Sequence, residues 1–202
     1  MKVEHVKSPT GAEYIHVKEI PEDILFYARR EVARSIPLMM GDNIAAAGTD
    51  ASGAGVSKRK GKAVFLTSIY RESSGQELFS DSHHLVQAVV TKVLDDLDFM
   101  PYSPMMQVHA LQNAGHILLS VYESGDYYKA HPDLAMLTGL FWLSDDTEFS
   151  GGELFFPQFG ETIEPKMGTG IIFPSFYLHE VLQVETKPDF HTRFTITCFC
   201  GA

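Results

Sequence analysis

The chain has 202 residues, of which 45% are hydrophobic and 21% charged, and its formal net charge at pH 7 is −10. This length accommodates one domain with a sizeable core and hardly two. The acidic balance argues against nucleic acid as a partner, because phosphate binding needs clustered Lys and Arg. No apolar stretch approaches the roughly 18 residues of a membrane span, and the first ten residues contain no apolar signal segment.

The first forty residues predict a strand over 14–18 and then a helix that opens at Pro21. Proline suits a first helical turn, and Glu22 and Asp23 suit the positive end of the helix dipole. Residues 41–62 are rich in Gly, Ala and Ser and have no periodic apolar face, so we expect a mobile loop. Such a loop either closes over a nearby site or is a solvated surface loop without a role.

Residues 80–98 predict the clearest helix of the chain. Ser80 or Asp81 can cap it, and the histidines His83 and His84 near its start are expected in solvent rather than at a metal. Apolar residues recur at i, i+3 and i+4, which predicts that one face packs on a sheet. These residues are Leu85, Val86, Val89, Val90, Val93, Leu94 and Leu97.

From about residue 105 onward, short apolar runs alternate with Gly, Asn and Ser turns, as at 113–115, 124–126, 151–152 and 168–170. This spacing favours an all-β sandwich or barrel. We therefore expect a mainly β fold with flanking helices and a jelly-roll, cupin-like core, the double-stranded β-helix. Residues 1–202 would be a single domain, in which 1–104 support a core formed by 105–202.

Two imidazoles and one carboxylate occur in the order His131-Pro-Asp133 … His179, which is the ligand set of a facial triad. In an extended segment, His131 and Asp133 emerge on the same face. Such a triad suits Fe(II) and leaves roughly three coordination positions open. Arg193 follows His179 by fourteen residues on a strand that alternates with Thr195 and Thr197. It is either an inward clamp for a dicarboxylate or an exposed arginine on an edge strand.

The triad lies among further motifs in a fixed order: Tyr122-Glu-Ser-Gly-Asp-Tyr-Tyr128 before it, then Gly151-Gly-Glu153, Gly168-Thr-Gly170 and Arg193-Phe-Thr. Over residues 107–200 this resembles the prolyl-4-hydroxylase-like branch of the 2-oxoglutarate- and Fe(II)-dependent dioxygenases. The resemblance implies Fe(II), 2-oxoglutarate and O2, with ascorbate as a reductant. It also implies that an unactivated C–H bond, of a prolyl residue in a peptide, is hydroxylated while 2-oxoglutarate becomes succinate. The stretch from His179 to Arg193 is longer than is common, and we interpret residues 185–190 as an insertion in a turn.

The resemblance also assigns candidate residues to the co-substrate. It implies that Tyr122 hydrogen-bonds to 2-oxoglutarate, that Arg193 holds its distal carboxylate and that Tyr128 packs near the metal. Trp142 stands where relatives have a tyrosine that reaches the distal carboxylate. Its indole N–H is either a donor there or part of a side chain that fills the core, and we favour the core. Thr138 is a second candidate donor.

The remaining histidines and the two cysteines have simpler explanations. His109 and His116 are expected to lie across a hairpin, and His191 belongs to the inserted turn. Cys198 and Cys200 are two apart on a strand, where a disulfide would be strained, so we expect buried thiols and a reducing, cytoplasmic location. A metal-binding Cys-x-Cys is the alternative, although no second pair of cysteines completes a zinc site.

Two other functions remain open. The chain could oxidise a small molecule, such as a free amino acid or a nucleobase, although a nucleobase enzyme would need more positive charge than Lys58-Arg59-Lys60 supplies. Alternatively it is a cupin-like metal-binding module without turnover. Arg193 and the tyrosines before His131 argue against such a module, which has no need for a co-substrate clamp. The sequence leaves the exact substrate and the oligomeric state open.

Overall fold

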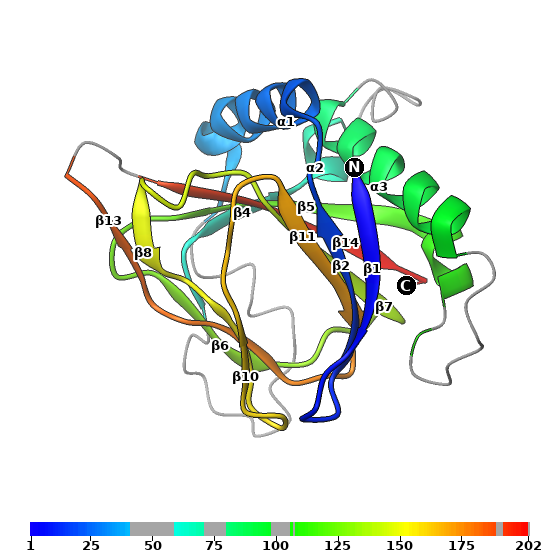
Figure 1. Cartoon of the computed structure of the whole chain (residues 1–202). Helices are drawn as coiled ribbons and strands as arrows, with labels where there is room; N and C mark the ends of the chain where they lie inside the picture. The colour runs from blue at the N-terminus through cyan, green and yellow to red at the C-terminus, as the bar shows by residue number, and fades with distance from the viewer. Residues whose placement is uncertain (41–58, 71–79, 98–105, 107, 189–191, 202) are drawn as a thin grey trace.

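A computed structural model describes residues 1–40, 59–70, 80–97, 106, 108–188 and 192–201. Two antiparallel sheets face each other, and the helices cover the outer face of the larger one (Figure 1). This is the double-stranded β-helix, or jelly roll, expected from the alternation of short strands and turns. No described helix has the length and apolar character needed to cross a bilayer.

The larger sheet has seven strands and is extended at both edges by strands from the N-terminal third of the chain. In spatial order they are β1 (Lys2–Lys7), β2 (Glu13–Lys18), β11 (Thr169–Pro174), β7 (Leu137–Trp142), β14 (Arg193–Cys200), β5 (Ala114–Tyr122) and β4 (Lys62–Phe65). Residues 2–18 and 62–65 thus contribute strands to the sheet itself, in addition to the support expected from this part of the chain.

The smaller sheet has five strands and lies opposite. Its order is β10 (Glu161–Ile163), β9 (Leu154–Phe156), β12 (His179–Val181), β6 (Tyr127–His131) and β3 (Arg59–Lys60). A two-stranded sheet, β13 (Val184–Thr186) with β8 (Phe149–Gly151), projects beyond it. Strands from distant parts of the chain therefore converge between the two main sheets.

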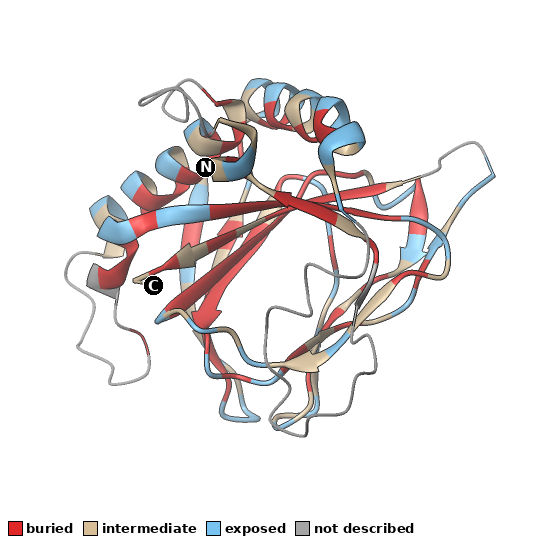
Figure 2. Cartoon of the chain, turned by 180° about the vertical axis from the view of Figure 1, so that it is seen from behind, coloured by how far each residue is buried: buried red, intermediate tan, exposed pale blue. Residues whose placement is uncertain are grey.

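The helices are α1 (Glu22–Ser35), α2 (Leu66–Ile69) and α3 (Asp81–Leu97), with 3-10 turns η1 (Ile36–Leu38) and η4 (Val108–Asn113). Helix α3 agrees closely with the predicted range, and its valines are buried against the large sheet (Figure 2). Pro21, with φ of −54°, precedes the first turn of α1 as its N-cap residue. Each fully buried valine or leucine contributes about 1.5–3 kcal/mol, so this helix–sheet layer is the main core.

A second apolar cluster fills one end of the space between the two sheets. It contains Tyr14, Leu140, Trp142, Leu154, Phe156, Ile171, Phe173 and Tyr177, all buried. Phe156 meets Phe173 and Tyr177 edge to face, with ring centroids 5.1 and 5.9 Å apart. This packing holds the two sheets at a fixed separation beside the remaining interior space.

Three local predictions need correction. The predicted loop ends earlier than residue 62, because Arg59–Lys60 pair with β6 as β3, while 41–58 lie outside the described residues. The hairpin expected between His109 and His116 is wrong: 108–113 form η4, and exposed His116 pairs with Phe199 of β14. Part of the supposed insertion is strand, since Glu185 and Thr186 belong to β13, whereas His191 is not described.

Candidate metal centre and co-substrate pocket

The three candidate metal ligands come together where two neighbouring inner strands of the small sheet, β6 and β12, end and begin. His131 ends β6 and His179 begins β12, and the two are direct cross-strand partners. Asp133 follows two residues after His131, and its backbone N–H donates to the carbonyl oxygen of Ser175 at 2.8 Å. This hydrogen bond fixes Asp133 next to the segment that leads into His179. The side chains of His131, Asp133 and His179 therefore lie close together.

The ligand atoms form a compact set of donors. One nitrogen of each histidine and one carboxylate oxygen lie within 4.8 Å of one another. Nε2 of His131 is 3.7 Å from Oδ1 of Asp133, and Nε2 of His179 is 3.3 Å from Oδ2. Two imidazoles and one carboxylate on one face are the donors that suit a non-haem Fe(II).

The backbone sets the orientation of both imidazoles. Nδ1–H of His131 donates to the carbonyl oxygen of Lys129 at 2.7 Å, and Nδ1–H of His179 donates to that of Tyr177 at 3.0 Å. A donor at Nδ1 leaves the lone pair on Nε2, which faces Asp133. Tyr128 also stacks on His131, with ring centroids 3.6 Å apart and planes 20° apart, as the prediction of packing near the metal requires.

The carboxylate of Asp133 accepts a hydrogen bond from Thr138, a residue expected from the sequence to donate to the co-substrate instead. Thr138 O–H donates to Oδ2 of Asp133 at 2.7 Å, and Oγ of Ser175 lies 2.8 Å from the same hydroxyl oxygen. Thr138 is therefore engaged with the metal ligand, not available as a donor to the distal carboxylate. Burial alone raises the pKa of Asp133, but its contacts with His179 and Thr138 outweigh burial and leave the pKa below its usual value. The carboxylate is ionised at neutral pH, as a metal ligand must be.

A cavity of about 120 Å³ extends from the three ligands into the space between the sheets. Its wall is mainly apolar, and besides the ligands it carries the hydroxyl groups of Ser120, Tyr122, Tyr128, Thr138 and Thr197. The lining residues are Phe65, Leu118, Ser120, Tyr122, Tyr128, His131, Asp133, Thr138, Leu140, Leu154, Phe173, His179, Val181, Thr197 and Phe199.

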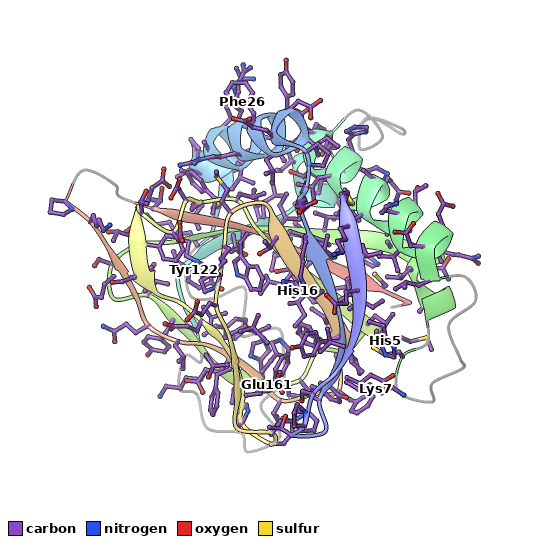
Figure 3. The ribbon with its side chains drawn as sticks, viewed as in Figure 1. His5, Lys7, His16, Phe26, Tyr122 and Glu161 are labelled. Carbon is purple, nitrogen blue, oxygen red and sulfur yellow. The ribbon has the colours of Figure 1, made fainter. Side chains whose placement is uncertain are left out.

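Arg193 lies beyond the deep end of this cavity and is fully buried, with 1% of its surface exposed. It pairs in register with Tyr122 of β5, which lies in the interior (Figure 3). The guanidinium carbon is 5.5 Å from the ring centroid of Tyr122 and 5.3 Å from that of Phe149. None of its three nitrogens has a hydrogen-bond partner among the described residues. The prediction of an inward rather than an exposed arginine is thus correct.

Burial lowers the pKa of Arg193 to about 10, and the charges of Tyr122 and Glu153 act in the opposite direction. The guanidinium therefore remains charged at neutral pH. Burying a charged guanidinium without a counter-ion costs free energy, so this position favours the binding of an anion. A planar guanidinium matches a carboxylate in a bidentate pair.

The sequence interpretation missed several residues that complete the site. Ser175 and Phe149 had no motif that could single them out, because their roles depend on tertiary contacts. The Gly151-Gly152 pair was visible in the sequence as a turn signal, but the sequence did not show why Gly152 must be a glycine. A Cβ on Gly152 would lie 3.1 Å from Nη1 of Arg193, and its φ of +72° favours glycine. Gly152 therefore leaves room for the guanidinium.

Comparisons with known proteins agree with this geometry. Residues 117–201 match the family model described as the 2OG-Fe(II) oxygenase superfamily. This match supports an oxidoreductase with Fe(II) as its cofactor and with 2-oxoglutarate and O2 as its co-substrates. No curated protein matches the chain.

Solved prolyl hydroxylases share the fold over nearly the whole chain, at low identity. The Pseudomonas putida prolyl-4-hydroxylase is 16% identical, with a TM-score of 0.58, and the match covers 93% of this chain and 91% of that one. A Trichoplax adhaerens prolyl hydroxylase in complex with a hypoxia inducible factor peptide is 15% identical, with a TM-score of 0.59 and coverage of 93% and 83%. The viral collagen prolyl hydroxylase of Paramecium bursaria Chlorella virus-1, in a 2-oxoglutarate complex, is 16% identical, with a TM-score of 0.53 and coverage of 93% and 94%.

The residues present fit the groups that the superfamily uses. The Nε2 atoms of two histidines and a carboxylate oxygen converge at one end of the cavity. Beyond the other end lies the guanidinium of Arg193, which has no hydrogen-bond partner among the described residues. When bound, Fe(II) and 2-oxoglutarate supply the oxidising chemistry that inserts an oxygen atom from O2 into a C–H bond.

Proposed function

We propose that the chain is an Fe(II)- and 2-oxoglutarate-dependent hydroxylase of prolyl residues in a peptide or protein. One observation carries the proposal: a single cavity has a facial set of metal ligands at one end, and beyond its other end lies a buried guanidinium that has no hydrogen-bond partner in the part of the chain that the structure describes. A dicarboxylate that chelates a metal at one end needs both features at once.

In this proposal His131, Asp133 and His179 hold Fe(II), and Thr138 orients the carboxylate of Asp133. Arg193 holds the distal carboxylate of 2-oxoglutarate by a bidentate, charge-assisted pair. Tyr122 lines the cavity beside Arg193, which supports its predicted contact with 2-oxoglutarate. The apolar residues between the two ends lower the local dielectric constant, which strengthens both electrostatic interactions.

The choice of a prolyl substrate is supported by the apolar wall near the metal. Phe65 of β4 and Phe199 of β14 have ring centroids 6.3 Å apart, and Leu118 lies between their strands. Phe199 is the register partner of Thr138, so this wall is at the level of the metal ligands. A pyrrolidine ring is compact and apolar and packs well on such a surface. Similarity of fold to three prolyl hydroxylases supports the same choice.

The first experiment tests the metal and co-substrate. Fe(II) and then 2-oxoglutarate are added anaerobically, and the visible metal-to-ligand charge-transfer band of the chelate is recorded. We expect a band that needs both additions, disappears in His179→Ala and is unchanged in His84→Ala, whose exposed imidazole lies on α3. Absence of the band in the wild type would refute the hydroxylase and favour a cupin-like binding module.

A second experiment tests the substrate. Peptides that contain proline, matched peptides with alanine in its place and free amino acids are incubated with Fe(II), 2-oxoglutarate, O2 and ascorbate. Mass spectrometry measures the addition of one oxygen, and succinate is measured in parallel. Oxidation of the proline peptides alone supports the proposal, whereas oxidation of a free amino acid would assign the small-molecule alternative.

We also propose that the protein works in a reducing, cytoplasmic environment. Cys198 and Cys200 are free and buried, and their Sγ atoms are 3.6 Å apart, in contact but not bonded. Burial and the neighbouring thiol raise the pKa of Cys198 well above its usual value, so this thiol is not reactive at neutral pH. Thiol titration of the protein in cell extract, with and without prior reduction, measures whether both remain reduced.

A further inference from the structure

The outer face of helix α1 carries two aromatic side chains in solvent. Phe26 and Tyr27 are 55% and 50% exposed, and Phe26 lies at the outer surface of the helix layer (Figure 3). Their rings meet edge to face with centroids 5.3 Å apart, and Cζ of Arg30 lies 5.5 and 5.9 Å from the two centroids. Aromatic residues and arginine are the types enriched at protein–protein interfaces, so this group indicates a docking surface.

Charged side chains of opposite sign lie on the two sides of the aromatic pair. Glu22 and Asp23 are exposed in the first turn of α1, and Arg30 and Arg34 are exposed toward its end. None of the four has an ion-pair partner in the described part of the chain. Their charges cancel, whereas the whole chain has a formal net charge of −10. A second acidic molecule is therefore repelled less at this face than elsewhere.

The order acidic, aromatic, basic along α1 is complementary to its own reverse. If two copies of α1 lie antiparallel and cross at Ala28, Glu22 is opposite Arg34 of the second copy, and Phe26 is opposite Arg30 of the second copy. A two-fold symmetric interface needs this kind of pattern, because the same patch must fit itself. The opposed helix dipoles of an antiparallel pair also favour it.

We propose that two copies of this chain associate through the outer face of α1 as an antiparallel helix pair. An acidic peptide would pair with the two arginines but would meet Glu22 and Asp23 with like charge, whereas a second copy matches both signs. Helix α1 covers the outer face of the large sheet, and the metal-binding cavity lies on the other side of that sheet. The pairing therefore leaves both cavities uncovered and does not depend on the proposed function.

The first test measures the mass of the full chain in solution. Analytical ultracentrifugation up to about 0.5 mM protein detects even a weak association, and we expect a monomer–dimer equilibrium. Phe26→Ala should weaken the dimer by roughly 10-fold or more, because a central aromatic residue contributes much of the binding free energy of an interface. Phe176→Ala is the matched control, because Phe176 is 62% exposed but lies between β11 and β12, away from α1.

Charge reversal tests the antiparallel order. Glu22→Arg and Arg34→Glu should each weaken the dimer by roughly 5-fold, since each turns two symmetry-related attractions into repulsions. The double variant should regain most of the lost affinity, because the pairs form again with their signs exchanged. Lys92→Glu on α3 makes the same change in net charge as Arg34→Glu and should have no effect. In a parallel pair, like residues would face each other, and neither single reversal would weaken the dimer.

Single introduced cysteines locate the crossing point. At about 1.5 Å per residue, the two copies of residue 27 would be roughly 3 Å apart along the helices, and the two copies of residue 33 roughly 15 Å apart. Tyr27→Cys should therefore form an intermolecular disulfide when diamide is added as oxidant, and Ala33→Cys should not. The native Cys198 and Cys200 are buried and do not interfere.

Each outcome decides the inference. A wild type that stays monomeric at every concentration refutes it and leaves the α1 face to a different partner. A dimer that Phe176→Ala disrupts and Phe26→Ala does not would use another surface, and the inference would be wrong. Cross-linking at residue 33 but not at residue 27 would contradict the antiparallel crossing at Ala28.

Discussion

The polar side chains at the metal end of the cavity are hydrogen-bonded to other groups of the protein, whereas the nitrogens of Arg193 and Trp142 have no such partner among the described residues. His131 and His179 donate to backbone carbonyls, and Asp133 accepts from Thr138. The Arg193 guanidinium lies instead beside the rings of Tyr122 and Phe149.

This difference separates two ways of building a binding site. The metal end is organised before any ligand arrives, so its geometry survives without the ion and its donors need little rearrangement. At the arginine end, the free energy lost by burying the charge of Arg193 is not compensated until an anion binds. Changes at the two ends should therefore affect stability in opposite directions.

The largest effect is expected from Arg193→Met, which removes the charge and keeps much of the volume. Binding of 2-oxoglutarate should weaken by roughly 30-fold or more, since loss of one partner of a buried charge pair costs about 2–5 kcal/mol. The ligand-free protein should be as stable as the wild type or more stable, because the unpaired charge is gone. Calorimetry and thermal unfolding measure the two quantities. A variant that loses both affinity and stability would show that Arg193 is already satisfied in the free protein.

Gly152→Ala tests whether the guanidinium needs the space left by the glycine. The added Cβ would meet Val184 Cγ2 at 2.8 Å and Nη1 of Arg193 at 3.1 Å. We expect about 10-fold weaker 2-oxoglutarate binding, equivalent to about 1.4 kcal/mol, and lower stability. Gly160→Ala is the control, because Gly160 has a similar φ of +62° but nothing within 4 Å of a Cβ. Equal losses of affinity in the two variants would contradict a direct effect on Arg193.

Thr138→Val tests the metal end, because it removes the hydroxyl that orients Asp133 and keeps the shape of the side chain. Metal affinity should fall by roughly 10-fold, the lower range for such outer contacts. Unlike Arg193→Met, this variant should also lower the stability of the metal-free protein. Binding of the distal carboxylate alone, measured with glutarate, should not change. Thr169→Val, which removes a hydroxyl that donates to the carbonyl of Lys166 on the surface, is the control.

The smallest effect concerns pH. The pKa of Asp133 is lower in the folded than in the unfolded chain, so its contribution to stability is present above the unfolded value and is lost as pH falls through the folded one. Denaturant unfolding of the metal-free protein between pH 6 and pH 3 should show less acid destabilisation in Asp133→Asn than in the wild type. An identical pH dependence in the two proteins would mean that Asp133 is not stabilised as the anion.

Much of the fold and of the candidate site was predictable, because the signals were local. The i, i+3, i+4 spacing of the valines in α3, the turn residues after 105 and the His131-Pro-Asp133 spacing are each contained within a few residues. Even Arg193 could be assigned to an inward face, since alternation along one strand decides which side chains share a face. The cytoplasmic location, the substrate and the ligand roles remain predictions.

The sequence by itself determined the β architecture, the helix that covers the sheet and the residue types that meet at the metal. Only the tertiary structure decided that Thr138 hydrogen-bonds to Asp133 and that Gly152 leaves room for Arg193. It decided as well that Trp142 and Thr195 are neighbours of that arginine and have no hydrogen-bond partner among the residues that the structure describes. It also replaced the expected hairpin at His116 by a 3-10 turn and a strand. The physical reason is that periodicity records which face of an element is buried, whereas a hydrogen-bond partner depends on the register between strands that are distant in the chain.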